Sequence, residues 1–141
     1  RLYNICNVQY FTLKEIKEEN RKTLKKEPEN ASNRCSALLV GPNDFADMDA
    51  IKRTADNTNM MQEILAKNGF TLFQHNHDFE FQRIDGKLKY EIYRELCPNV
   101  KYEIDCFWST NLGVEDPVKM LDLFAKDTIL LHMKDGVASQ K

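Results

Sequence analysis

The chain has 141 residues, 42% hydrophobic and 30% charged, a composition typical of one soluble globular domain rather than a disordered or fibrous protein. Its 20 basic and 22 acidic residues give a net charge of -2, so no overall positive charge attracts nucleic acid or an anionic membrane. No apolar run approaches the roughly 18 residues that a membrane helix needs, and the first residues lack a signal-peptide pattern. These features predict a cytoplasmic protein that binds neither nucleic acid nor membrane.

Five short apolar or β-branched stretches recur along the chain and predict five strands. They lie at residues 2–8, 37–40, 70–73, 100–104 and 128–131. The intervening segments have mainly helical patterns, and this alternation predicts a parallel sheet, either open and doubly wound or closed into a barrel. No GxGxxG or Walker-type glycine loop follows a strand, which counts against a nucleotide-binding open sheet.

Capping patterns predict where the first two helices begin and end. Thr12 and Glu15 have the spacing of a capping box, so the first helix is expected to open there and to end before Pro28. The second helix is expected from about residue 47 to residue 68, with Gly69 as its carboxyl-terminal cap. Its apolar residues near helical spacing, which predict a buried face, are Met48, Ile51, Ala55, Met61 and Leu65.

Two further local patterns lie in the second half of the chain. Asp85 and Gly86, flanked by alternating residues, predict a type I′ turn and a small hairpin between residues 79 and 90. Asp116 followed by Pro117 predicts the start of a last helix, because the carboxylate can cap the helix and proline suits its first position. The buried stripe of this helix is expected to contain Val118, Leu121 and Phe124 or Ala125.

Polar residues gather where three of the predicted strands end. The third strand runs into Gln-His-Asn-His-Asp-Phe-Glu at residues 74–80, the fourth into Glu-Ile-Asp-Cys-Phe-Trp at 103–108, and the fifth into His-Met-Lys-Asp at 132–135. In parallel α/β folds, ligands and catalytic groups collect at these carboxyl ends. Side-chain alternation along the strands predicts that Asp105 and His132 project side by side, so the three clusters point to one site.

Histidine and carboxylate side chains in one cluster indicate a divalent metal site, because carboxylate oxygens favour harder ions and imidazole favours transition metals. The four cysteines show no CxxC spacing, which makes a closed structural zinc site a poorer interpretation. A carboxylate that does not hold the metal could remove a proton next to a carbonyl while the ion stabilises the resulting enediolate. This chemistry is typical of metal-assisted isomerisation.

Each of these residues also has a structural interpretation. A lone His75 or His77 is at least as often a hydrogen-bonded structural histidine as a ligand, although strand alternation places these two on the same face. Trp108 could be a core residue, Asp105 a capping carboxylate, and residues 134 and 135 a surface pair. The combined arrangement, more than any one residue, favours a functional site.

Three segments carry a resemblance to a known family. They are Phe-Gln-His-Asn-His-Asp-Phe-Glu-Phe at residues 73–81, Tyr-Glu-Ile-Asp-Cys-Phe-Trp at 102–108 with Gly113 and Asp116-Pro117, and Leu-Leu-His-Met-Lys-Asp at 130–135. In their order and spacing they resemble the sugar phosphate isomerase/epimerase family with the xylose isomerase-like TIM barrel. The resemblance spans roughly residues 38–135 and implies an α/β fold, a partial (β/α)8 TIM barrel of about five βα units.

The resemblance also implies a divalent metal, Mn²⁺, Mg²⁺, Co²⁺ or Zn²⁺, held by two glutamates, an aspartate and a histidine. Asp105 and His132 match the aspartate and the histidine. Glu80 is the nearest candidate for the first glutamate and for an acid/base role, while Gln74 occupies what could be the ligand position in some relatives. The last glutamate lies on the strand after the His-x-Lys-Asp segment, so this chain ends before it.

Further residues are implied to face the substrate, a small sugar or sugar phosphate. By the resemblance His75 and His77 contact substrate hydroxyls or support the metal, and Trp108 supplies an apolar wall. Lys134 is a catalytic candidate that polarises a substrate oxygen, and Asp135 is a substrate-binding candidate.

The size of the chain predicts an incomplete barrel, because a complete one takes roughly 250 residues and eight strands. The sequence begins at Arg1 without an initiator methionine and stops six residues after the His-x-Lys-Asp segment. We therefore expect residues 1–141 to form a single TIM-barrel domain truncated at both ends. Its open sheet edges favour association, which makes a homo-oligomer one expected state.

The leading functional hypothesis is a metal-dependent sugar or sugar-phosphate isomerase or epimerase. A dehydratase acting on an inosose uses nearly the same site, and the motifs do not separate the two. Apurinic endonucleases share the barrel, although the balanced charge counts against DNA binding. A further alternative is an inactive, truncated segment that binds carbohydrate or metal weakly.

Overall fold

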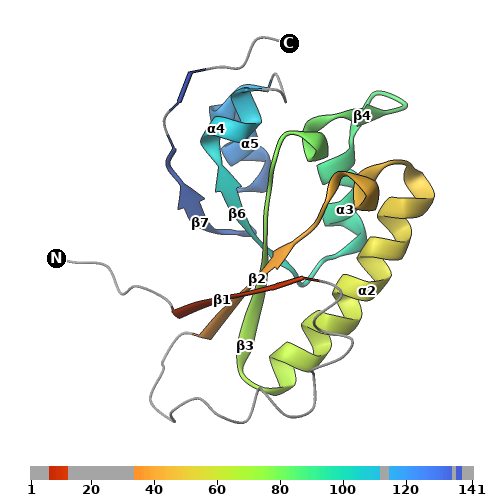
Figure 1. Cartoon of the computed structure of the whole chain (residues 1–141), viewed down its shortest axis with the longest axis vertical. Coiled ribbons are helices and arrows are strands. Elements are labelled where there is room, and N and C mark those ends of the chain that lie inside the picture. Colours follow the sequence, from red (N-terminus) through yellow and green to blue (C-terminus); the bar gives the residue numbers. More distant parts are fainter. Residues whose placement is uncertain (1–6, 13–33, 112–114, 135, 138–141) are drawn as a thin grey trace, which may run out of the picture.

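A parallel β-sheet of five strands forms the centre of the molecule. A computed structural model describes residues 7–12, 34–111, 115–134 and 136–137, and its sheet has the order β1-β2-β3-β6-β7, with every neighbouring pair parallel (Figure 1). The strands are β1 (Asn7–Thr12), β2 (Arg34–Leu39), β3 (Phe70–His75), β6 (Lys101–Asp105) and β7 (Thr128–His132).

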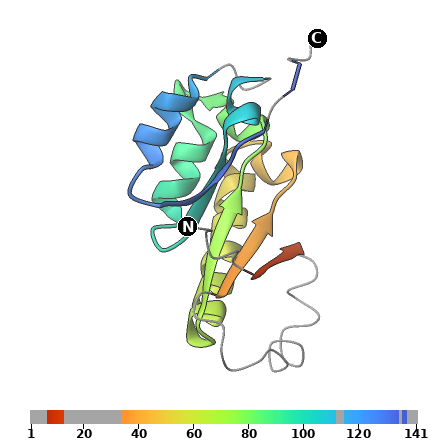
Figure 2. The ribbon, with the colours of Figure 1, turned by 90° about the vertical axis from the view of Figure 1, so that its left-hand side faces the viewer.

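The longer helices lie on one face of this sheet (Figure 2). They are α2 (Met48–Lys67), α3 (Lys89–Leu96) and α5 (Pro117–Phe124). Shorter elements follow the strands at their carboxyl ends: η1 (Pro42–Phe45), η2 (Phe79–Phe81), the hairpin β4 (Arg83–Ile84) and β5 (Lys87–Leu88), and α4 (Cys106–Thr110). In the described part of the chain, no helix is long and apolar enough to cross a membrane.

The strand order distinguishes a barrel from a doubly wound sheet. The neighbours in the sheet follow the order of the chain, and no reversal of direction creates the switch point of an open α/β sheet. On the face away from the helices, Cys35, Ala37 and Phe73 form a small separate cluster against Leu130. This is the arrangement of a barrel wall, with helices outside and side chains inside. The predicted partial (β/α)8 barrel is confirmed.

The predicted caps of α2 and the predicted hairpin are confirmed. Asp47 accepts a hydrogen bond from the Ala50 amide at 2.8 Å at the start of α2, and Gly69 follows its end with a φ of +77°. The hairpin turns at Asp85 and Gly86, which both have positive φ, as a type I′ turn requires.

Several sequence-based boundaries were wrong. The first described strand is Asn7–Thr12, which continues past the predicted end at residue 8. The rest of the helix predicted to open at Thr12, residues 13–28, lies outside the described part. Asp116 and Pro117 do begin α5, but Val118 is 64% exposed, and the buried residues are Met120 and Phe124. The α3 helix was missed as a separate element, because the hairpin pattern runs directly into it.

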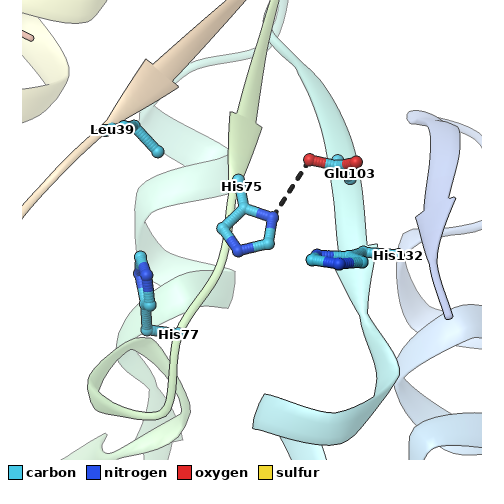
Figure 3. A pocket seen from close by; sticks show the side chains of 5 residues that line it. All are labelled: Leu39, His75, His77, Glu103 and His132. Carbon is cyan, nitrogen blue, oxygen red and sulfur yellow. Dashed lines mark hydrogen bonds and ion pairs between the residues drawn. The ribbon is translucent and has the colours of Figure 1, made fainter. Parts of the chain in front are cut away.

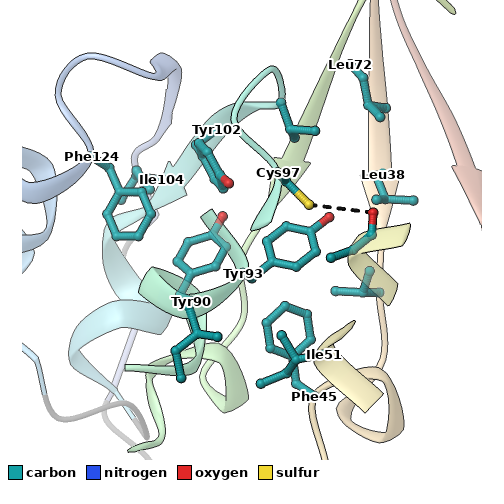
Figure 4. Packing of buried hydrophobic residues seen from close by; sticks show 14 of the residues in the cluster. Leu38, Phe45, Ile51, Leu72, Tyr90, Tyr93, Cys97, Tyr102, Ile104 and Phe124 are labelled. Carbon is teal, nitrogen blue, oxygen red and sulfur yellow. Dashed lines mark hydrogen bonds between the residues drawn. The ribbon is translucent and has the colours of Figure 1, made fainter. Parts of the chain in front are cut away.

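The main core lies between the sheet and the helices and contains three buried tyrosines (Figure 4). Tyr93 donates a hydrogen bond from its hydroxyl to Thr58 Oγ1 at 2.8 Å. The hydroxyls of Tyr90 and Tyr102 are also buried but have no hydrogen-bond partner among the described residues. Burial raises the pKa of both, so these phenols are neutral. The core therefore contains two hydroxyl oxygens for which no hydrogen bond from the described residues offsets the lost contact with water.

This contrast predicts opposite effects for two Tyr-to-Phe substitutions. Tyr102→Phe keeps the ring against Tyr90 and Phe124 and should raise the free energy of unfolding by up to ~1–3 kcal/mol, because an uncompensated hydroxyl is removed. The control Tyr93→Phe loses a formed hydrogen bond and should lower it by ~1 kcal/mol. Urea unfolding followed by circular dichroism measures both. An equal loss of unfolding free energy in the two variants would contradict the conclusion that the Tyr102 hydroxyl lacks a hydrogen bond.

Candidate metal centre

Three neighbouring strands bring the predicted site residues together at their carboxyl ends. In the sheet register His75 of β3 lies opposite Glu103 of β6, and Asp105 of β6 lies opposite His132 of β7. Residues two apart on a strand share a face, so all four side chains project toward the inside of the barrel wall. The predicted side-by-side placement of Asp105 and His132 is confirmed.

Three of these side chains converge on one point. His75, Asp105 and His132 each offer one ligand atom, and the three atoms lie within 4.8 Å of one another. Asp105 Oδ2 is 2.9 Å from His132 Nδ1 and 3.8 Å from His75 Nε2. Two imidazole nitrogens and one carboxylate oxygen form a donor set that suits divalent transition metals.

The two oxygens of Asp105 have different surroundings. Oδ1 accepts hydrogen bonds from the backbone amides of Phe107 and Trp108, both at 2.9 Å, and thereby caps α4. Oδ2 is buried and accepts no hydrogen bond from any described residue, although His132 lies close to it. A buried carboxylate oxygen without a hydrogen bond is costly unless a cation compensates it. This oxygen therefore fits a metal ligand.

Asn76 holds the backbone of Asp105 in place. Its side-chain oxygen accepts a hydrogen bond from the Asp105 amide at 2.9 Å, and its side-chain nitrogen donates to the Asp105 carbonyl at 3.3 Å. These two bonds continue the contact between β3 and β6 beyond the last ladder pair, His75 and Glu103. The fully buried Asn76 thus fixes the position from which the Asp105 carboxylate projects.

A pocket opens beside the three converging side chains (Figure 3). It has a volume of about 250 Å³ and is lined by Leu39, His75, His77, Glu103 and His132. Asp105 itself is fully buried. The pocket therefore combines imidazole and carboxylate groups with one aliphatic side chain, at the barrel end where ligands bind in this fold.

An aromatic wall adjoins His77. Its ring stacks on Phe79 with centroids 5.7 Å apart and lies 6.0 Å from the ring of Trp108. The exposed Lys134 places its Nζ 4.4 Å from the centroid of the Trp108 ring. Burial, followed by the neighbouring His75, lowers the pKa of His77, so its imidazole is neutral at pH 7 and can exchange hydrogen bonds with hydroxyl groups.

Glu80 occupies a different environment from the one predicted. It is fully buried, its Oε2 accepts a hydrogen bond from the His77 amide at 2.9 Å, and its Oε1 accepts one from Gln74 Nε2 at 3.3 Å. Burial raises the pKa of Glu80 to about 8. It does not belong to the converging group. Gln74 is also buried and, next to His75 on β3, projects to the opposite face.

The structure thus brings together some of the predicted residues and adds one. Asp105 and His132 lie together as predicted, and the third member of the converging group is His75. Glu103 lines the pocket and contacts His75, but the sequence interpretation gave it no role. The sequence feature that could have identified Glu103 is its position two residues before Asp105 on the same strand, which places both side chains on one face. Asp135 lies outside the described residues.

Comparisons with models of protein families and with the sequences of curated proteins find no match. A comparison with solved structures finds a sugar phosphate isomerase/epimerase from Parabacteroides distasonis ATCC 8503. The two structures superimpose with a TM-score of 0.62 and 27% sequence identity, over 72% of this chain. The chain is similar in structure to a sugar phosphate isomerase/epimerase.

This similarity confirms the resemblance that the strand-end motifs indicated and the partial TIM-barrel fold. It supports the general class of isomerase or epimerase enzymes, and the His-Asp-His group gives that class a candidate metal site. The match covers 38% of the solved isomerase/epimerase, so this chain spans well under half of that protein's length.

Proposed function

We propose that this chain carries metal-binding residues of a sugar or sugar-phosphate isomerase or epimerase that works by proton transfer next to a carbonyl. The observation that supports this most directly is the convergence of His75, Asp105 and His132 within 4.8 Å. It occurs at the carboxyl ends of barrel strands, in a structure similar to a sugar phosphate isomerase/epimerase.

The proposed ligands are His75 Nε2, Asp105 Oδ2 and His132 Nδ1. Two imidazoles and one carboxylate suit Mn²⁺, Co²⁺ or Zn²⁺ better than Mg²⁺, which prefers oxygen ligands. A divalent ion bound here would act as a Lewis acid on a substrate oxygen and so stabilise the negative charge that develops when the adjacent carbon loses a proton. Asp105 contributes a negatively charged carboxylate, and its two hydrogen bonds from α4 amides fix the orientation of that group.

Residues in and beside the pocket would bind and orient the substrate. Glu103 can accept hydrogen bonds from sugar hydroxyls, and the neutral His77 can both donate and accept them. The half-buried Trp108, beside His77, can pack against an apolar sugar face. The pocket volume of about 250 Å³ suits a small sugar. Lys134 stays a proposed group for polarising a substrate oxygen or binding a phosphate, because its exposed ammonium lies beside Trp108.

The acid/base role of Glu80 stays a prediction. Its two oxygens already accept hydrogen bonds from Gln74 and His77, and no contact brings it into the pocket. A carboxyl with a pKa of about 8 is protonated at neutral pH, so in this setting it could give a proton more readily than take one.

The test is deuterium exchange from solvent. The protein is stripped with a chelator, reloaded with Mn²⁺, Co²⁺ or Zn²⁺, and incubated in D₂O with a panel of aldoses, ketoses and their phosphates. We expect metal-dependent incorporation of deuterium at the carbon next to the carbonyl, read by NMR and mass spectrometry. Metal binding without exchange on any substrate would remove the isomerase proposal and leave a metal-binding protein.

A further inference from the structure

The contact between His75 and Glu103 involves the nitrogen of the ring that does not face the metal centre. His75 Nδ1 lies 3.0 Å from Glu103 Oε2, and the two side chains are 10% and 17% exposed (Figure 3). The sheet register places the two residues opposite each other on β3 and β6. The contact is therefore built into the strand pairing and is partly shielded from water.

The other nitrogen of the same ring faces the centre. His75 Nε2 lies 3.8 Å from Asp105 Oδ2 and belongs to the converging group with His132. A neutral imidazole carries one N–H and one lone pair, and a carboxylate oxygen can only accept. Because Nδ1 is at hydrogen-bonding distance from Glu103, the proton belongs on Nδ1, and the lone pair on Nε2 is directed toward Asp105 and His132.

Glu103 has no competing cation among the described residues. Among the described residues, no lysine or arginine forms an ion pair with it, and Lys101, two residues earlier on β6, pairs with Asp127 at 3.0 Å instead. Glu103 also stays outside the group of converging ligand atoms. Its influence on the centre therefore passes through the ring of His75.

We propose that Glu103 is a positioning residue that fixes the tautomer and orientation of His75, keeping the proton on Nδ1 and the lone pair of Nε2 aimed at the Asp105–His132 pair. The metal consequence rests on the function proposed above: carboxylate partners of ligating histidines typically account for roughly 10- to 100-fold in metal affinity. The tautomer itself is a property of the metal-free protein.

The first experiment uses the chelator-treated protein with ¹⁵N-labelled histidine. Long-range ¹H–¹⁵N correlation spectra at mildly alkaline pH report which ring nitrogen carries the proton, and comparison with His75→Gln assigns the signals. We expect His75 to be the Nδ1–H tautomer in the wild type and in Glu103→Gln, whose amide oxygen can still accept. In Glu103→Ala the proton should redistribute toward Nε2. A wild-type His75 with its proton on Nε2 overturns the proposal without any variant.

The second experiment measures Zn²⁺ and Co²⁺ affinity by calorimetry. Glu103→Ala should bind ~10- to 100-fold more weakly than wild type, and Glu103→Gln should recover much of that loss. Glu95→Ala, which removes an exposed glutamate on α3, is the matched control and should leave affinity unchanged. Affinity within twofold of wild type for Glu103→Ala contradicts the positioning role. If the wild type shows the Nδ1–H tautomer but binds no metal, the proposed metal-dependent function is refuted, while the proposal that Glu103 fixes the tautomer of His75 stands.

Discussion

Replacing Asp105 with asparagine is expected to weaken divalent-metal binding by more than ~100-fold, beyond the loss typical of residues that only support a ligand. The amide oxygen of asparagine can still accept the hydrogen bonds from Phe107 and Trp108 that cap α4. The second position becomes an NH₂ group, which offers no lone pair to a cation. Calorimetric titration with Zn²⁺ or Co²⁺ measures the change.

The matched control for this substitution is Asp116→Asn. Asp116 also caps a helix, α5, through a 2.9 Å hydrogen bond from the Val118 amide, but it is exposed and is not part of the converging group. The Asp116→Asn substitution should leave metal affinity unchanged. Because both caps survive, the free energy of unfolding of each metal-free variant should stay within ~1 kcal/mol of wild type. If the two variants bind metal equally well, the centre is not built around Asp105.

Stability should fall as the pH rises from 4.5 to about 8, because of Glu80. Burial raises the pKa of this carboxyl, so the folded state keeps a proton that the unfolded state has already released over this interval. The stabilisation is complete below the ordinary pKa and is lost as the pH passes through the folded-state value. Its magnitude is on the order of 3–5 kcal/mol.

Glu80→Gln should remove most of this pH dependence, because glutamine is neutral throughout and its oxygen can still accept from the His77 amide. Above pH 8 the variant should be more stable than wild type, and at pH 4 the two should be similar. Denaturant unfolding across the pH range measures this. Glu63→Gln, at an exposed position of α2, should keep the wild-type profile. If the free energy of unfolding of Glu80→Gln depends on pH as steeply as that of wild type, Glu80 is not the source of the pH dependence.

The strands of the main sheet and the side-by-side placement of Asp105 and His132 were predictable, because both depend on local alternation. Apolar runs lie in or overlap each of the five strands of the main sheet, although the first run overlaps β1 only at its start, and side-chain alternation placed Asp105 and His132 on the inner face. Where the predicted burial of a residue was wrong, its tertiary environment was the reason. Val118 lies in the apolar sequence of α5 but outside its buried face, since Met120 and Phe124 contact the core instead. Periodicity alone does not show which of two neighbouring apolar stripes meets the sheet.

The surroundings of Glu80 and His75 could not be predicted for a similar reason. The turn η2 directs the Glu80 carboxyl back to the amide of His77, a bond between residues three apart that the sequence motif does not reveal. His75 gained its place through the pairing of β3 with β6, which brings it to both Glu103 and Asp105. Pairing between strands 28 residues apart could not be derived from either segment alone.

The cap on α4 has a practical consequence for spectroscopy. Asp105 Oδ1 is bonded to the backbone amide of Trp108, which is the single tryptophan of the chain. All indole emission therefore originates from a residue whose backbone is hydrogen-bonded to the carboxylate that is proposed to bind the ion, and the Lys134 ammonium lies 4.4 Å from the centroid of the indole ring. The protein carries its own fluorescent reporter, placed where ion occupancy and substrate contact would both alter the field around the indole.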